Sequence, residues 1–493
     1  MASQISFDNT YARLPAHFFA RVLPAGGEAP ALVQVNRELA CELGLDPDWL
    51  QSPDGVEVLA GAAILPGSEP IATAYAGHQF GNFVPQLGDG RAVLLGEVID
   101  HLGRRRDIQL KGAGRTPYSR GGDGRAALGP VLREYVVSEA MAALGVPTTR
   151  ALAAVTTGER VYREVALPGA VLARVASSHI RVGTFQFFAA RQDIEALQVL
   201  ADYTIARHYP ACAETENPVL ALLEAVVQAQ AQLVAKWMLI GFIHGVMNTD
   251  NMSMAGETID YGPCAFMDNY DPATVFSSID QGGRYAFGNQ PQIAQWDLTR
   301  LAESLLPVIA DETAQAIELA TGALSTFQGC FGAAFEAGLA RKLGYAEWRE
   351  DDTPMVNAMF EAMADNQVDF TLFFRRLSVI GESAGIDDEP LRELFVNPLA
   401  CDDFLKQWRG RIGSDHLSGE QRREMMRTAN PAFIPRNHRV EAIIVAAVES
   451  GDFGPFEELL QVLTKPYDDQ PAFARYAEPP APHERVAATF CGT

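Results

Sequence analysis

The sequence contains little cysteine and little positive charge, and both shortages exclude classes of protein. Its 493 residues include 6 cysteines. They lie far apart and form no C-x-x-C pair, so neither a zinc framework nor a disulfide scaffold is indicated. The 39 basic residues face 62 acidic ones, which gives a net charge of −23. Nucleic acids and anionic membranes are bound by positive charge, so we expect neither as a partner, although a local basic pocket stays compatible with this balance.

Long uninterrupted apolar runs are missing as well. The most apolar stretch, residues 218–247, is interrupted by Glu224, Lys236 and several glutamines, which predicts a buried helix and not a membrane span. The first residues show no basic stretch followed by an apolar one, so we expect no signal peptide. Together with the scattered cysteines this favours a reducing, cytoplasmic location. Hydrophobic residues make up 48% of the chain, which excludes wholesale disorder.

The patterning along the chain predicts a strand-rich first part and a helical second part. Residues 1–70 are interpreted as an irregular N-terminal extension with short helices. Period-2 alternation predicts strands within 71–190, and helical spacing dominates 191–464. Residues 465–493 are rich in proline and are expected to form an extended C-terminal tail. We therefore predict an α+β, bilobal fold, with a strand-rich N-lobe, a hinge near 185–195 and a mostly helical C-lobe.

The individual elements are predicted from the spacing of apolar residues and from the glycines and prolines that end helices and strands. Alternation predicts the strands, and i, i+3, i+4 spacing predicts the helices. The predicted strands are 91–98, 107–111, 161–165 and 171–175, and the predicted helices are 34–43, 128–144, 194–208, 217–243, 297–308, 312–342 and 356–381.

A basic, glycine-rich segment stands out within the acidic chain. Residues 91–133 include nine basic and four acidic residues, with glycines interleaved among them. Basic side chains neutralise a polyphosphate, and glycines let the backbone approach it closely. The turn Gly88-Asp-Gly-Arg91 directly precedes a predicted strand and suits the same chemistry. A solvated basic loop and a simple Asp-Gly hairpin turn are the alternatives.

Two short motifs after a long helix predict a metal-dependent phosphotransfer site. Residues 244–251 are His-Gly-Val-Met-Asn-Thr-Asp-Asn, and Asp260-Tyr-Gly follows. The order is typical of protein-kinase-like enzymes, H-R-D-x-x-x-x-N and then D-F-G. Asn251 and Asp260 take the metal-binding positions, with oxygen atoms that suit Mg²⁺ or Mn²⁺. Val246 occupies the position at which a kinase has its proton-accepting aspartate, and Asp250 could supply that carboxylate instead. The alternative is that Asp250-Asn251 and Asp260-Tyr-Gly are two unrelated turns without a catalytic role.

Upstream residues supply the remaining parts of such a site. Lys111 ends a predicted strand, in the manner of the lysine that binds phosphates, and Glu134 on the next helix is its expected partner, with Glu139 as the competitor. Arg174 and Arg181 lie where a kinase binds adenine. Two arginines there suit phosphate and not a base; exposed strand arginines are the alternative.

Long stretches of the sequence resemble the selenoprotein O family, also called the YdiU family. The resemblance extends over almost the whole chain. It implies a kinase-like, pseudokinase fold that binds ATP in an inverted orientation and transfers AMP to Ser, Thr or Tyr hydroxyls of proteins, with release of pyrophosphate. It is carried by AYAGHQFGNFVPQLGDGRAVLLGE, IQLKGAGRTPYSRGGDGRAALGPVLREY, LARVASSHIRVGTFQFF, GFIHGVMNTDNMS, DYGPCAFMDNY and NPAFIPRNHRVEAII.

The same resemblance implies a role for individual residues. Asp250 is the general base, and Asn251 and Asp260 bind Mg²⁺ or Mn²⁺. Transfer of UMP from UTP is a variant of this activity. One alternative function is a kinase that transfers the γ-phosphoryl group to a protein or to a small molecule. The other is a catalytically dead scaffold that only binds nucleotide. The residues implied at the nucleotide are Gly88, Gly90, Arg91, Lys111 with its partner Glu134, Asp123, Gly124, Arg174, Arg181 and Asp260.

Cys491 occupies the third position from the end, where some members of the family carry selenocysteine. In some relatives this residue forms a disulfide with a cysteine at the position that is Phe276 here, so that bridge is not expected. A bridge to Cys264 is an alternative, and a free Cys491 is the expectation.

Overall fold

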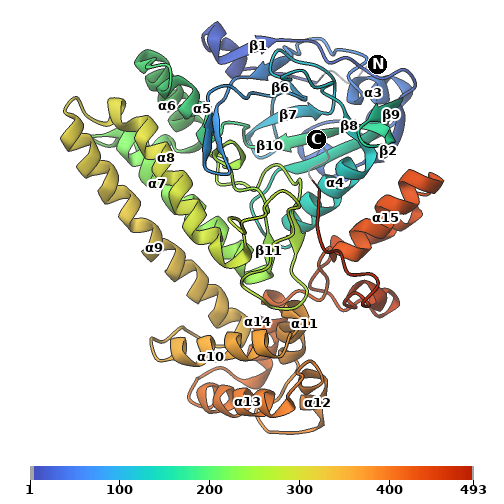
Figure 1. Ribbon diagram of the computed structural model, residues 1–493, viewed down its shortest axis with the longest axis vertical. Coiled ribbons are helices and arrows are strands. Elements are labelled where there is room, and N and C mark those ends of the chain that lie inside the picture. The colour runs from blue at the N-terminus through green and yellow to red at the C-terminus, as the bar shows by residue number, and fades with distance from the viewer. Residues whose placement is uncertain (1–4, 491–493) are drawn as a thin grey trace.

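The computed structural model describes residues 5–490 and is built around one antiparallel sheet (Figure 1). The strand order is β1-β3-β6-β7-β10-β9-β2, and the short strand β8 pairs with β10 outside this order. A separate hairpin of β4 and β5 and a short pair of β11 and β12 complete the strands. The bounds are β1 (Phe19–Arg21), β2 (Ala31–Val35), β3 (Ile71–Thr73), β4 (Gly77–Gln79), β5 (Asn82–Val84), β6 (Ala92–Ile99), β7 (Arg105–Lys111), β8 (Ala126–Ala127), β9 (Arg150–Tyr162), β10 (Ala166–Ala176), β11 (Phe242–Ile243) and β12 (Ala265–Phe266).

Helices make up most of the second half of the chain and confirm the predicted mixed fold. In Figure 1 the long helices α7, α8 and α9 run along one side, and α10 to α13 form the end farthest from the sheet. The bounds are α1 (Arg37–Glu42), α2 (Pro47–Leu50), α3 (Pro53–Leu59), α4 (Leu128–Ala143), α5 (Val182–Ala189), α6 (Ile194–His208), α7 (Pro218–Ile240), α8 (Gln290–Ile309), α9 (Thr313–Leu343), α10 (Asp352–Asp365), α11 (Phe370–Leu377), α12 (Glu389–Arg392), α13 (Pro398–Ile412), α14 (Gly419–Ala429), α15 (Asn437–Ser450) and α16 (Gly454–Leu463).

The sheet has one apolar and one polar face, and β7 shows why. Successive side chains of a strand alternate between faces. Ile108 and Leu110 pack into a core with side chains from α1, α2 and α3. Asp107, Gln109 and Lys111 therefore share the opposite face. They are buried, so this face holds charge and hydrogen-bonding groups that must find partners within the protein.

The helix predicted at 297–308 begins earlier, at Gln290, and the strand predicted at 171–175 begins at Ala166. Two further predicted elements differ for local reasons. The helix expected at 356–381 is divided into α10 and α11, because Gln367 adopts a positive φ of 51° and Asp369 starts a new helix by accepting from the Leu372 backbone N–H. The strand expected at 161–165 begins much earlier, at Arg150, and ends at Tyr162 where the chain turns into β10.

The N-terminal residues contribute more to the sheet than their sequence indicates. The short helices expected within residues 1–70 are confirmed by α1, α2 and α3. The expectation that the remainder is irregular was wrong, because β1 and β2 pair with β3 and β9 and form the two edges of the sheet. Both strands are short and are separated by proline and glycine, so their apolar alternation is too brief to be recognised in the sequence.

Helix α7 has the length and apolar composition of a membrane span. More than half of its most apolar stretch is buried within the protein, where it packs along α8 and α9. Leu222, Val226 and Val234 on this helix are fully buried in the largest core. The core therefore accounts for the apolar character of residues 218–247.

Arg436 joins the C-terminal part of the chain to the helical half. The side chain is 1% exposed. Its Nη1 donates to Asp369 Oδ2 at 2.8 Å and to Asp268 Oδ1 at 2.5 Å, and its Nε donates to the Ala477 carbonyl at 2.9 Å. One guanidinium thus holds three separate segments together.

We expect Arg436→Met to lower the free energy of unfolding by about 3–5 kcal/mol, because it leaves the buried Asp369 carboxylate without a counterion. Urea denaturation followed by fluorescence measures the change. Arg423→Met on α14, which removes an exposed arginine, is the matched control and should unfold like the wild type. Equal midpoints for the two variants would contradict this role of Arg436.

Candidate active site

A cavity of about 350 Å³ lies between the polar face of the sheet and the loops that follow α7. Its lining includes five basic and three acidic residues, which favours an anionic ligand. Eight of the residues expected at the nucleotide or the metal line it together: Gly90, Arg91, Lys111, Arg174, Arg181, Asp250, Asn251 and Asp260.

Asp260 is the point at which the basic side chains of this cavity converge. Its Oδ1 accepts from Lys111 Nζ at 2.9 Å and from Arg174 Nη1 at 2.6 Å, and its Oδ2 accepts from Arg181 Nη1 at 2.5 Å. Burial alone would raise the pKa of Asp260, but Lys111, Arg174 and Arg181 lower it well below its usual value. Asp260 is therefore a carboxylate with three cationic partners.

Lys111 has a second partner on α4. Its Nζ donates to Glu134 Oε2 at 2.6 Å, the pairing expected from the sequence. Glu139, the competing candidate, instead forms a two-point ion pair with Arg150 and accepts from the backbone N–H of Ala151. Glu134 lies behind Lys111 and does not line the main cavity, so it orients the lysine from outside.

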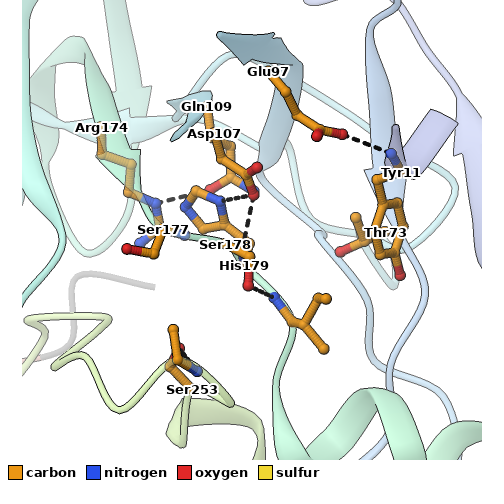
Figure 2. Close-up of polar contacts among 12 residues, drawn as sticks. Tyr11, Thr73, Glu97, Asp107, Gln109, Arg174, Ser177, Ser178, His179 and Ser253 are labelled. Carbon is orange, nitrogen blue, oxygen red and sulfur yellow. Dashed lines mark hydrogen bonds and ion pairs between the residues drawn. The ribbon is translucent and has the colours of Figure 1, made fainter. Parts of the chain in front are cut away.

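The polar face of β7 supports Arg174 and the segment that follows it (Figure 2). Arg174 Nε donates to Gln109 Oε1 at 2.8 Å, and the backbone N–H of His179 donates to Asp107 Oδ2 at 2.9 Å. Burial raises the pKa of Asp107, but Arg207 and His179 lower it to about 2. Asp107 is thus an ionised, buried group that fixes the segment between Arg174 and the start of α5.

Asp89 completes this support and was not among the residues expected at the site. Its Oδ2 accepts from Thr73 Oγ1 at 2.6 Å and from Gln109 Nε2 at 3.3 Å, and Arg181 Nη2 lies 3.9 Å from its Oδ1. Asp89 lies in the Gly88-Asp-Gly-Arg91 turn, where an aspartate is common for local reasons. The turn closes no hairpin, because β5 pairs with β4, and β6 with β3 and β7.

Asp250 combines deep burial with an unpaired oxygen. Its Oδ1 has no hydrogen-bond partner among the described residues, and its Oδ2 receives only a long bond of 3.4 Å from Gln79. Burial raises the pKa of Asp250 to about 6, and Arg181 opposes this rise. A Cβ at Gly77 would lie 2.4 Å from Asp250 Oδ1, so β4 approaches the carboxylate closely because this residue is glycine.

The loop that carries Asp250 is anchored by residues that the sequence motif did not single out. Asn248 Oδ1 accepts from the Phe80 backbone at 3.0 Å and from the Tyr285 hydroxyl at 2.6 Å. Thr249 Oγ1 accepts from the His78 backbone at 2.7 Å. His244 Nε2 contacts the Ile259 carbonyl at 2.9 Å, which ties the first motif to the segment of Asp260.

The expected metal ligands fit a hard cation by their donor atoms. Asn251 Nδ2 donates to the Val246 carbonyl at 2.9 Å, which leaves the amide oxygen as an acceptor, and both Asn251 and Asp260 line the cavity. Within residues 5–490, no group of three or more His, Cys, Asp or Glu side chains is arranged to hold an ion. Two protein oxygens completed by phosphate oxygens are the donor set that Mg²⁺ takes in nucleotide sites.

Besides Glu134, three of the expected nucleotide residues lie beside the cavity and not on its wall. Gly88 has a φ of 88° and packs against Tyr118. Asp123 forms an ion pair with Arg163 at 2.8 Å. Gly124 has a φ of 68°, and a Cβ there would lie 2.1 Å from the Gly114 carbonyl oxygen, so this glycine is required by the packing of its own loop.

Most of the basic segment 91–133 serves the fold and not the cavity. Only Arg91, Lys111 and Arg120 line it. The other basic residues have acidic side chains or carbonyls as partners. Some partners lie within the segment: Arg104 and Arg106 pair with Asp100, and Arg115 donates to the Gly121 and Gly122 carbonyls. The others lie outside it, which a count along the sequence cannot show: Arg105 pairs with Asp8, Arg125 with Glu159 and Arg133 with Glu441.

The question of the terminal cysteine lies outside the described residues, which end at position 490. Cys264 is a free, buried thiol. Burial raises its pKa to about 12, so it is a poor nucleophile. The expectation of a free Cys491, and the alternative of a bridge to Cys264, therefore stay predictions from the sequence.

Comparison with known proteins agrees with the geometry. Residues 1–464 match the family model described as protein adenylyltransferase SelO. A protein from Bradyrhizobium sp. (strain BTAi1 / ATCC BAA-1182) that is called protein nucleotidyltransferase YdiU is 64% identical over 493 residues and covers all of both chains. Proteins of the same name from Methylorubrum extorquens (strain PA1) and Rhodopseudomonas palustris (strain BisB5) are each 63% identical, again over the full length of both chains. The chain therefore belongs to the SelO family of protein adenylyltransferases.

Proposed function

We propose that this protein transfers AMP from ATP to the side-chain hydroxyl of a protein and releases pyrophosphate. The observation that carries the proposal is the burial of the cations. Arg174 and Arg181 are each 2% exposed and lie with Lys111 at the inner wall of the cavity. Such a wall suits the phosphate chain and not a purine, which binds apolar surfaces and backbone groups. ATP would then enter with its γ-phosphate first, in the inverted orientation.

The inverted orientation supports attack at the α-phosphorus. With the terminal phosphates held by the arginines, the α-phosphate lies nearer the opening of the cavity. The hydroxyl oxygen forms a bond to this phosphorus, the bond to pyrophosphate breaks, and the hydroxyl proton passes to Asp250. Asp250 lines the cavity, and its Oδ2, which receives only one long bond from Gln79, is the acceptor; a pKa of about 6 keeps the carboxyl largely ionised at neutral pH.

Asn251 and Asp260 would hold the Mg²⁺ or Mn²⁺ that neutralises the phosphate charge. Because Asp260 pairs with Lys111, Arg174 and Arg181, an incoming triphosphate competes with it for these cations. Phosphate oxygens replace the carboxylate as their partner, and the carboxylate is released for the metal. The arrangement of sheet and helices around this site supports the kinase-like, two-lobed fold, with a first lobe at 71–190, to which β1 and β2 add the edge strands, and a second at 191–464.

The reaction is tested with ATP labelled at either the α- or the γ-phosphate and a general protein acceptor. We expect label on protein only from the α-position. Asp260→Ala should abolish it, because the variant loses the metal ligand. Circular dichroism checks that this variant, in which three buried cations also lose a partner, is still folded. UTP labelled at the α-phosphate, assayed in parallel, measures the UMP variant of the reaction. Label retained only from the γ-position would indicate a kinase, and wild type equal to Asp260→Ala in every transfer assay would indicate a scaffold.

The inverted orientation makes a separate prediction for nucleotide affinity. Arg174→Met removes a buried cation from the inner wall, so ATP should bind at least about tenfold more weakly, since hydrogen bonds to charged groups contribute about 1.5–3 kcal/mol. AMP, which lacks the terminal phosphates, should bind almost as it does to the wild type. Isothermal titration calorimetry measures both. Equal losses for AMP and ATP would place the base, and not the γ-phosphate, beside this arginine.

Gln109→Leu tests the support behind the arginine. The variant removes the acceptor of Arg174 Nε without changing any charge, so ATP affinity should fall by a smaller factor, about three- to tenfold. Gln198→Leu, which changes an exposed glutamine on α6, is the control. Unchanged ATP affinity in folded Gln109→Leu would show that Arg174 is held in place by Asp260 and Glu134 alone.

A further inference from the structure

A second cavity, of about 600 Å³, lies where the ends of α4 and α9 meet the side of α7. It shares no lining residue with the candidate active site. Its volume is within the range of small-molecule sites, about 300–1,000 Å³. The walls are mostly apolar, with Leu144, Val146, Leu239 and Ile240 among them, and alanine and glycine on α9 leave the space open.

The charged residues of this groove are all basic. Lys236, Arg341 and Lys342 line it, and no Asp or Glu does. No carboxylate of the described chain lies within 4.0 Å of any of these three side chains, since none of them takes part in an ion pair. In a chain of net charge −23, three neighbouring basic side chains without an acidic partner give the groove a local positive charge, which favours an anionic ligand.

Lys342 is the most informative of the three. It is only 4% exposed, and its Nζ lies over the ring of Phe374, 4.2 Å from the centroid. Burial lowers the pKa of Lys342 to about 7. A buried lysine without a carboxylate partner costs stability in the protein alone. Lysine at the last turn of α9 favours the helix dipole, but an exposed side chain would do the same without that cost.

Lys236 already has a hydrogen-bond partner within the protein, so the charged group of a ligand would lie at the other two basic residues. Its Nζ donates to the Gly145 carbonyl at 2.9 Å, and the Tyr467 hydroxyl donates to the Leu144 carbonyl at 3.0 Å. These contacts provide hydrogen-bond donors for the carbonyl groups that follow α4. The cations left for a ligand are therefore Arg341 and Lys342, on the α9 side of the groove.

We propose that this groove binds a small amphipathic anion, with an alkyl or aryl body against the apolar walls of α7 and α4 and a carboxylate head at Arg341 and Lys342. The apolar surface supplies affinity, and the two cations select the charge of the head. The site is independent of the nucleotide, so it does not rest on the transfer reaction.

The test uses dodecanoate below its micelle concentration and the full-length protein without nucleotide. Calorimetry should show dodecanoate binding to the wild type, and 1-dodecanol and dodecyltrimethylammonium, which have the same body but no negative charge, should bind at least about tenfold more weakly. Lys342→Met should weaken dodecanoate binding by about tenfold, with an unfolding temperature in the absence of dodecanoate at least equal to that of the wild type.

A pair of variants on α9 separates the shape of the groove from its charge. Ala337→Trp places a large side chain in the lining and should abolish binding without altering any cation. Ala333→Trp, an exposed neighbour outside the lining, should bind as the wild type does. The proposal is overturned if dodecanoate fails to bind the wild type, if 1-dodecanol binds as tightly, if Lys342→Met or Ala337→Trp leaves binding unchanged, or if an acidic peptide binds the groove where dodecanoate does not.

Discussion

The ion cluster around Asp260 is the interaction on which the rest of this structure depends. Lys111 comes from β7, Arg174 from β10, Arg181 from the start of α5 and Glu134 from α4. All are largely removed from water, where an unpaired charge would cost several kcal/mol. None of these elements can shift far without separating charges, so the cluster fixes the sheet, the helix behind it and the loop of Asp260 relative to one another.

The cluster also explains how one set of side chains can serve two purposes. Asp260 adopts a positive φ of 61°, a conformation that costs a non-glycine residue about 1–3 kcal/mol. The three cations hold it there. In the proposed reaction a triphosphate takes over the cations, so the carboxylate changes from counterion to metal ligand without moving to another part of the protein. Binding of nucleotide and binding of metal are then coupled through a single residue.

The sequence predicted which residues form the site better than it predicted which residues hold them in place. Asp250, Asn251 and Asp260 follow one another in a short motif, and Lys111 ends an alternating strand, so their convergence was predictable. Asp89 and Gln109 were missed because their roles depend on pairing between strands. The basic segment was overestimated, since acidic partners such as Glu441 lie hundreds of positions away along the chain. Local patterns show which groups are present, and only the fold shows which of them are already neutralised.

The two short strands near the N-terminus have a consequence for how the chain folds. They occupy opposite edges of the sheet, and β2 pairs with β9, whose residues follow more than a hundred positions later. On the ribosome, the first strands to emerge must wait for a partner that is made much later, while their backbone groups remain open to other chains. Contacts of such long separation slow folding. The N-terminal segment thus supplies both edge strands of the sheet, and one of them, β2, can pair only after β9 has been made.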